Sequence, residues 1–147
     1  MRSALLAIAV IGCGGGSSEV DEYKRKSMET EARVQLNKLS KLARVVHTEK
    51  GAYPIGSTGL TPNKPCCQYA DKRCPPSADA WNTDVWAAFD FVVDEPHRFQ
   101  YSYESKDGQT FTATAVGDVA CAGTPKTFTI TGKTGPAGAE VDISQIR

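Results

Sequence analysis

The sequence predicts an α+β fold, in which one long amphipathic amino-terminal helix packs on a three- or four-stranded antiparallel sheet. Three observations carry this prediction. Residues 19–50 have helical periodicity, the carboxy-terminal half alternates apolar and polar residues between turn sequences, and a cysteine-rich segment lies between the two. A chain of 147 residues is the size of one domain. We expect that domain to span residues 23–147.

Residues 19–50 contain neither proline nor glycine, and their apolar residues recur at spacings of three and four. Such spacing places one apolar stripe along a helix; here it comprises Met28, Ala32, Leu36, Leu39, Ala43 and Val46. Lys50 and Gly51 supply the expected stop. The pattern predicts a helix whose first turns project beyond the packed body. Two shorter helices with a break near Ser27 are the alternative.

Residues 51–78 are rich in proline, glycine, serine and cysteine, which predicts a long irregular segment. Loops of this length are uncommon in small domains unless they are crosslinked or functional. Residues 78–91 then mix aromatic residues with helix formers. We expect a short helical turn there, followed by an aromatic cluster that packs in the core: Trp81, Trp86, Phe89, Phe91, Tyr101 and Tyr103.

The remaining chain has the period-two pattern of half-buried strands. Residues 98–104 alternate, the turn sequence 106–108 follows, and residues 110–115 resume the alternation. Residues 126–131 predict a third strand, and residues 140–143 a short fourth. Successive strands with short links form a meander whose apolar face needs a cover. The long helix is the element that can provide it.

The first twelve residues, MRSALLAIAVIG, have the form of an export signal. Arg2 precedes a short apolar run, which falls well below the roughly 20 residues that span a bilayer. No later run approaches that length. We therefore expect residues 1–12 to be a cleaved signal peptide and the rest of the chain to be exported.

The residues around Cys13, Val10-Ile11-Gly12-Cys13, resemble the lipobox of bacterial lipoproteins. The resemblance implies diacylglycerol on Cys13, cleavage before it and acylation of the new amino terminus, for example with palmitate. Residues 13–22 are then a lipidated flexible tether. Gly14, rather than aspartate, agrees with the enterobacterial sorting pattern for the outer membrane, on its periplasmic or surface face. The alternative is an ordinary signal peptide with an incidental Cys13.

Assigning Cys13 to lipid leaves four of the five cysteines: Cys66, Cys67, Cys74 and Cys121. Four exported cysteines most simply form two disulfides. Because a bond between neighbouring Cys66 and Cys67 would be strained, one of these two pairs with Cys74 and the other with Cys121. A metal site that uses these thiols with His97 lacks metal-ligand spacing, so we expect no metal.

Composition and motifs argue against enzymatic activity and against nucleic-acid binding. Seventeen basic and seventeen acidic residues balance to zero net charge, which disfavours a nucleic-acid partner. His47 and His97 each lie near acids at the end of an element, where we expect solvated or capping residues. There is no nucleophile elbow, phosphate loop or calcium-loop spacing. The sequence therefore predicts a protein that is not an enzyme and has no cofactor.

Two polar features have open interpretations. Lys24-Arg25-Lys26 either contacts anionic lipid headgroups near the anchor or is a solvated helix start. The Gly117-Asp118 turn is expected to be a plain turn, with cation binding as the alternative.

Several segments together resemble the headgroup of type IV pilins. The helix exit Glu49-Lys50-Gly51-Ala52-Tyr53-Pro54 is similar to the pilin exit, and residues 86–91 look like the aromatic patch ahead of the pilin sheet. Residues 99–118 match the first hairpin of many pilin-like proteins. The resemblance covers roughly residues 24–132 and implies association with a pilus, secretion or adhesion system.

The chain departs from pilins at its amino-terminal end. A pilin carries about twenty apolar residues before the amphipathic half of its helix, but residues 17–22 here are polar. We therefore expect a non-enzymatic lipoprotein whose pilin-like head is held by the lipid on Cys13 and meets pilus or secretion proteins. The alternative is a periplasmic or surface lipoprotein that binds a small ligand or polysaccharide, unrelated to filaments.

Overall fold

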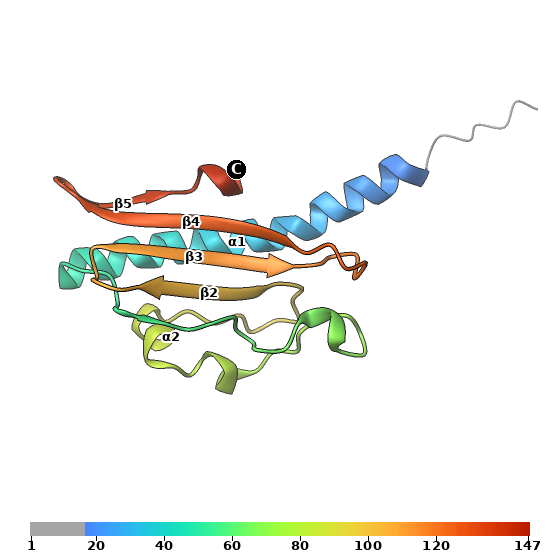
Figure 1. Ribbon diagram of the computed structural model, residues 1–147, viewed down its shortest axis with the longest axis horizontal. Helices are drawn as coiled ribbons and strands as arrows, with labels where there is room; N and C mark the ends of the chain where they lie inside the picture. Colours follow the sequence, from blue (N-terminus) through green and yellow to red (C-terminus); the bar gives the residue numbers. More distant parts are fainter. Residues whose placement is uncertain (1–16) are drawn as a thin grey trace, which may run out of the picture.

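The computed structural model describes residues 17–147, with side chains from residue 18 onward. The predicted signal peptide, residues 1–12, and the predicted lipidation site Cys13 lie outside the described residues. A single long helix, α1 (Ser17–Lys50), lies along one face of a five-stranded antiparallel sheet. Figure 1 shows its first turns extending past the end of the sheet. The predicted α+β class is confirmed.

The sheet is a meander in which strands adjacent in sequence are adjacent in space, in the order β1-β2-β3-β4-β5. Its strands are β1 (Gly56–Ser57), β2 (Gln100–Ser105), β3 (Thr110–Gly117), β4 (Lys126–Gly135) and β5 (Gly138–Asp142). The three predicted strands and the short fourth are present. The total of three or four was wrong, because Gly56 and Ser57 pair with the end of β2. A two-residue strand is too short to show alternation.

Helix α1 runs without a break through Ser27, as the continuous interpretation predicted. It begins at Ser17, so the structure places residues 17–22 in the helix rather than in the predicted tether. Its apolar stripe faces the sheet: Ala32, Leu36, Leu39 and Ala43 are fully buried. After Lys50, Gly51 takes a positive φ of 75°, and its N–H donates to the carbonyl of His47 at 2.8 Å. The predicted helix stop is therefore confirmed.

The core is aromatic. All six members of the predicted cluster are 4 % exposed or less, and two short helical segments, a 3-10 helix (Ala78–Trp81) and α2 (Asp84–Phe89), carry its tryptophans. The indole N–H of Trp86 donates to the Thr61 hydroxyl at 2.9 Å, so the polar edge of this buried ring has a partner. On β4, a side chain at Gly132 would overlap the ring of Phe111. That glycine lets the strand pass close to the core.

Two disulfides tie the irregular segment to the fold. They join Cys66 to Cys74 and Cys67 to Cys121, which is one of the two pairings that the sequence left open. The neighbouring Cys66 and Cys67 lie in a 3-10 turn (Cys66–Gln68) and form disulfides with different cysteines. The first bond closes a short loop, whereas the second reaches the connection between β3 and β4.

Candidate functional site

The candidate site lies at the end of the sheet where α1 leaves the body (Figure 1). Val20 and Tyr23, in the projecting turns, are 49 % and 75 % exposed. The β3–β4 connection, residues 118–125, lies at the same end and is held there by the Cys67–Cys121 disulfide. Two hollows flank this connection.

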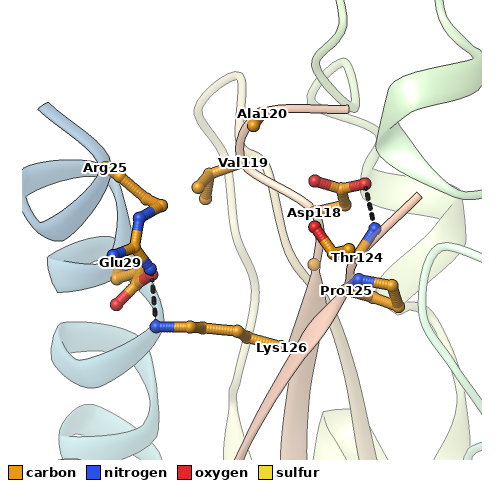
Figure 2. Close-up of a pocket in the computed structure, with 9 residues that line it drawn as sticks. Arg25, Glu29, Asp118, Val119, Ala120, Thr124, Pro125 and Lys126 are labelled. Atoms are coloured by element: carbon orange, nitrogen blue, oxygen red, sulfur yellow. Dashed lines mark hydrogen bonds and ion pairs between the residues drawn. The ribbon is translucent and has the colours of Figure 1, made fainter. Parts of the chain in front are cut away.

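The first hollow has a volume of about 240 Å³ and separates α1 from the β3–β4 connection (Figure 2). Glu29 of α1 is only 3 % exposed. Its carboxylate lies 3.2 Å from the Arg25 guanidinium and 2.8 Å from the Lys126 ammonium. A buried charge is tolerated where such partners surround it. This cluster fastens the departing helix to the start of β4 and pairs the Glu29 carboxylate with two cations.

The side chain of Asp118 is hydrogen-bonded to the backbone of its own β3–β4 connection. Its carboxylate accepts hydrogen bonds from the N–H of Gly123 at 2.6 Å and from the N–H of Thr124 at 3.0 Å, which Figure 2 shows. Partial desolvation raises the pKa of Asp118, but backbone N–H donors from this loop outweigh it, so the pKa lies below its usual value. The loop's own amides therefore use the carboxylate, which favours the plain-turn interpretation over cation binding.

The lowered pKa predicts an acid-dependent contribution to stability. A depressed folded-state pKa stabilises the fold above the unfolded value, about 3.9, and the contribution is lost as pH falls through the lower folded value. We expect Asp118→Asn to lower the melting temperature at pH 7 and the difference to shrink as pH falls below the unfolded pKa of about 3.9. Thermal melts from pH 7 to pH 2 measure it, with the exposed Asp94→Asn as control. A difference that stays constant from pH 7 to pH 2 would contradict this assignment.

The second hollow, of about 390 Å³, lies on the other side of the connection, beside the Cys67–Cys121 disulfide. Its lining is mainly apolar, and two of its polar side chains are engaged elsewhere. Gln100 donates from its amide to the Pro62 carbonyl at 2.7 Å, and the guanidinium of Arg98 lies 3.9 Å from Glu31. The hollow can therefore offer apolar contact but few free hydrogen-bonding groups.

The basic run at the start of the helix is largely neutralised within the helix. Lys26 pairs with Glu22 at 2.9 Å and Arg25 pairs with Glu29 at 3.2 Å. Residues 18–31 contain five acidic side chains against three basic ones. The projecting turns therefore carry no excess of positive charge, which favours the solvated helix start over contact with anionic headgroups.

Both histidines are buried, so the expectation that they are solvated or capping residues was wrong. His47 is 6 % exposed and its Nε2 lies 2.8 Å from the Thr134 hydroxyl. His97 is 1 % exposed and lies with Cys66 and Cys74. Within residues 18–147, the hydrogen bonds and ion pairs join neither histidine to a carboxylate. This burial could not be read from the sequence because segments distant in the chain supply it, β4 at His47 and the segment around Cys74 at His97.

A grouping of the cysteine thiols with His97 was considered from the sequence and rejected for lack of metal-ligand spacing, but the structure brings His97 together with Cys66 and Cys74. The segment around Cys74 pairs with the segment around His97 through an isolated β-bridge. No local sequence spacing predicts this bridge. The two residues are far apart in the sequence, so a search for metal-ligand spacing passes over them. The one available signal was a histidine directly ahead of a predicted strand in a cysteine-rich chain.

No family model, curated protein or solved structure shows significant similarity to this chain. Across residues 17–147, the helices are too short or too polar for any of them to cross a bilayer.

Proposed function

We propose that this chain is an exported, non-enzymatic lipoprotein, anchored through lipid on Cys13, with a type IV pilin-like head that serves a pilus, secretion or adhesion system. One observation carries the proposal. A continuous helix packs its second half on an antiparallel meander while its first turns project, and a disulfide ties the neighbouring loop to the sheet. This architecture agrees with the pilin-like segments of the sequence.

The helix also determines how the head would stand on a membrane. From Ser17 to Glu29, where packing on the body starts, an α-helix rises about 18 Å. The four residues from Cys13 to Ser17 add at most about 14 Å. The head would then lie within about 32 Å of its lipid, with the β3–β4 connection toward the membrane and the β2–β3 turn away from it. Partner proteins of a pilus, secretion or adhesion system would contact the membrane-distal end and the sides of the head.

The anchor is tested by replacing its cysteine. We expect Cys13→Ser to abolish incorporation of labelled palmitate and to release the protein from the membrane fraction, because the thioether requires the thiol. Cys121→Ser is the matched control, since it removes a cysteine assigned to a disulfide and should leave labelling intact. Undiminished labelling of Cys13→Ser would exclude this anchor.

The association is tested with the anchored protein in its own cells. Photo-crosslinking from residues near the β2–β3 turn should capture components of a filament or secretion machine. Crosslinkers at the β3–β4 connection, which would face the membrane, serve as controls. Equal capture from both ends, or capture of no such component, would count against the proposal.

A second candidate is a lipoprotein that binds a small ligand or polysaccharide, and the mainly apolar hollow of about 390 Å³ favours the small ligand. Small apolar molecules and neutral oligosaccharides, titrated against the whole chain, test this second candidate. Saturable binding that Val116→Asp in the hollow abolishes, and that persists without any filament system, would support the second candidate instead of the first.

A further inference from the structure

We infer that Cys66, Cys74 and His97 form a site for a thiophilic d¹⁰ cation of the Zn²⁺ class, which becomes available when the Cys66–Cys74 disulfide is reduced. The two sulfurs and an imidazole nitrogen lie within 4.8 Å of one another. All three residues are buried, with exposed fractions of 4 %, 0 % and 1 %. This inference does not depend on the proposed function.

The backbone holds Cys74 and His97 together independently of the disulfide. The N–H of Cys74 donates to the His97 carbonyl at 2.7 Å, and the N–H of His97 donates to the Cys74 carbonyl at 3.0 Å. Residues that are directly opposed in an antiparallel pair project their side chains to the same face, with Cβ atoms about 5 Å apart. Breaking the S–S bond therefore leaves a sulfur and an imidazole side by side.

The hydrogen bond of His97 leaves its other ring nitrogen with a free lone pair. Its Nδ1 lies 2.8 Å from the Glu95 carbonyl, and because a carbonyl oxygen only accepts, Nδ1 carries the proton. Nε2 is then the acceptor, and it is buried with no hydrogen-bond partner. Histidines that ligate metals commonly donate their other ring N–H to a backbone carbonyl, which fixes the ring. His97 already has that arrangement.

Cys66 is positioned by its neighbour. It begins the 3-10 turn in which Cys67 is bonded to Cys121 on the β3–β4 connection. When the Cys66–Cys74 bond alone is cleaved, the second disulfide still holds the turn in place. The three ligands then need only side-chain rotation to surround an ion, with S–metal distances of about 2.3 Å and an N–metal distance of about 2.0 Å.

The chemistry balances with a phosphine as the reductant. One phosphine and one water reduce the disulfide to two thiols and leave as the phosphine oxide. The cation then displaces two protons, so that two thiolates and neutral His97 bind it and a fourth tetrahedral position remains open. Thiolate and imidazole ligands favour Zn²⁺ and Cd²⁺ over Mg²⁺ or Ca²⁺. The same sulfurs cannot hold the disulfide and the metal at once.

Cadmium titration tests the site, because Cd²⁺ bound to thiolates absorbs in the ultraviolet. The chain with Cys13→Ser, which removes a competing thiol, is reduced with limiting phosphine until peptide mapping shows the Cys66–Cys74 bond cleaved and the Cys67–Cys121 bond intact, and is then titrated with Cd²⁺. We expect one equivalent to bind, and His97→Gln to weaken the binding at least tenfold. His47→Gln, which changes the other buried histidine, should have no such effect.

Nitrogen NMR of the histidine rings gives a readout that needs no substitution at the site. We expect Cd²⁺ to shift the Nε2 resonance of His97 in the reduced chain, to leave His47 unchanged, and to have no effect on the oxidised chain. An unshifted His97 at saturating Cd²⁺ would overturn the inference, whether the reduced chain stays folded or not. Equal Cd²⁺ affinity of the oxidised chain would overturn it as well.

Discussion

Replacing Trp86 with alanine should lower the free energy of unfolding by about 3–5 kcal/mol. Its side chain is fully buried, and its ring lies 5.5 Å from the ring of Trp81 and 5.1 Å from that of Phe91, measured between centroids. The substitution removes these contacts and leaves a cavity in the centre of the aromatic core. Urea unfolding followed by far-ultraviolet circular dichroism measures the loss without depending on the fluorescence of the removed tryptophan.

Two further variants separate packing from hydrogen bonding at this position. Trp86→Phe keeps most of the ring volume but leaves the Thr61 hydroxyl without its 2.9 Å donor, so it should cost about 1–3 kcal/mol. Tyr23→Ala removes an aromatic side chain that is 75 % exposed, and should change the stability by less than about 0.5 kcal/mol. If Trp86→Ala resembled Tyr23→Ala, the aromatic cluster would not be the core of this domain.

Removing the Cys67–Cys121 disulfide with the double substitution Cys67→Ser/Cys121→Ser should lower the free energy of unfolding by about 4 kcal/mol. The bond joins residues 54 apart in the sequence, so it strongly restricts the unfolded chain. The Cys66–Cys74 bond spans a separation of only 8 and contributes less by this route, about 2.5 kcal/mol. Both half-cystines of the long bond are only partly buried, so serine is tolerated at each.

Urea unfolding with and without a phosphine provides the control for this prediction. In the absence of reductant the parent should be the more stable, and in its presence the parent and the double variant should have nearly equal stabilities. A loss below about 1 kcal/mol without reductant would contradict the stabilising role of the bond. Peptide mapping of the parent should show Cys66 linked to Cys74 and Cys67 linked to Cys121.

The sequence predicts most of the fold because the main signals are local and periodic. The stripe from Ala32 to Val46 has helical spacing, and Gly51 provides the backbone freedom that ends the helix. Phe99, Tyr101 and Tyr103 alternate with polar residues and are all buried. In each case the spacing of the side chains that face the core is enough to predict the helix or strand that carries them.

The sequence does not predict the features that depend on two distant segments meeting. The strand β1 exists because the chain leaving α1 runs beside β2, and Glu29 is buried because Lys126 reaches it from β4. Neither contact produces a periodic pattern in the sequence. The same holds for His97, which the sequence context places at a solvated boundary and the fold places in the interior.

By itself the sequence determined the α+β class, the carboxy-terminal end of the helix, the order of the principal strands and the use of four cysteines in two disulfides. These follow from local periodicity, turn chemistry and cysteine arithmetic. Only the tertiary structure decided between the two cysteine pairings, because Cys66 and Cys67 are neighbours and spacing cannot distinguish them. It alone also brought His97 beside Cys66 and Cys74, since that proximity arises from the pairing of two strand-like segments distant in the chain.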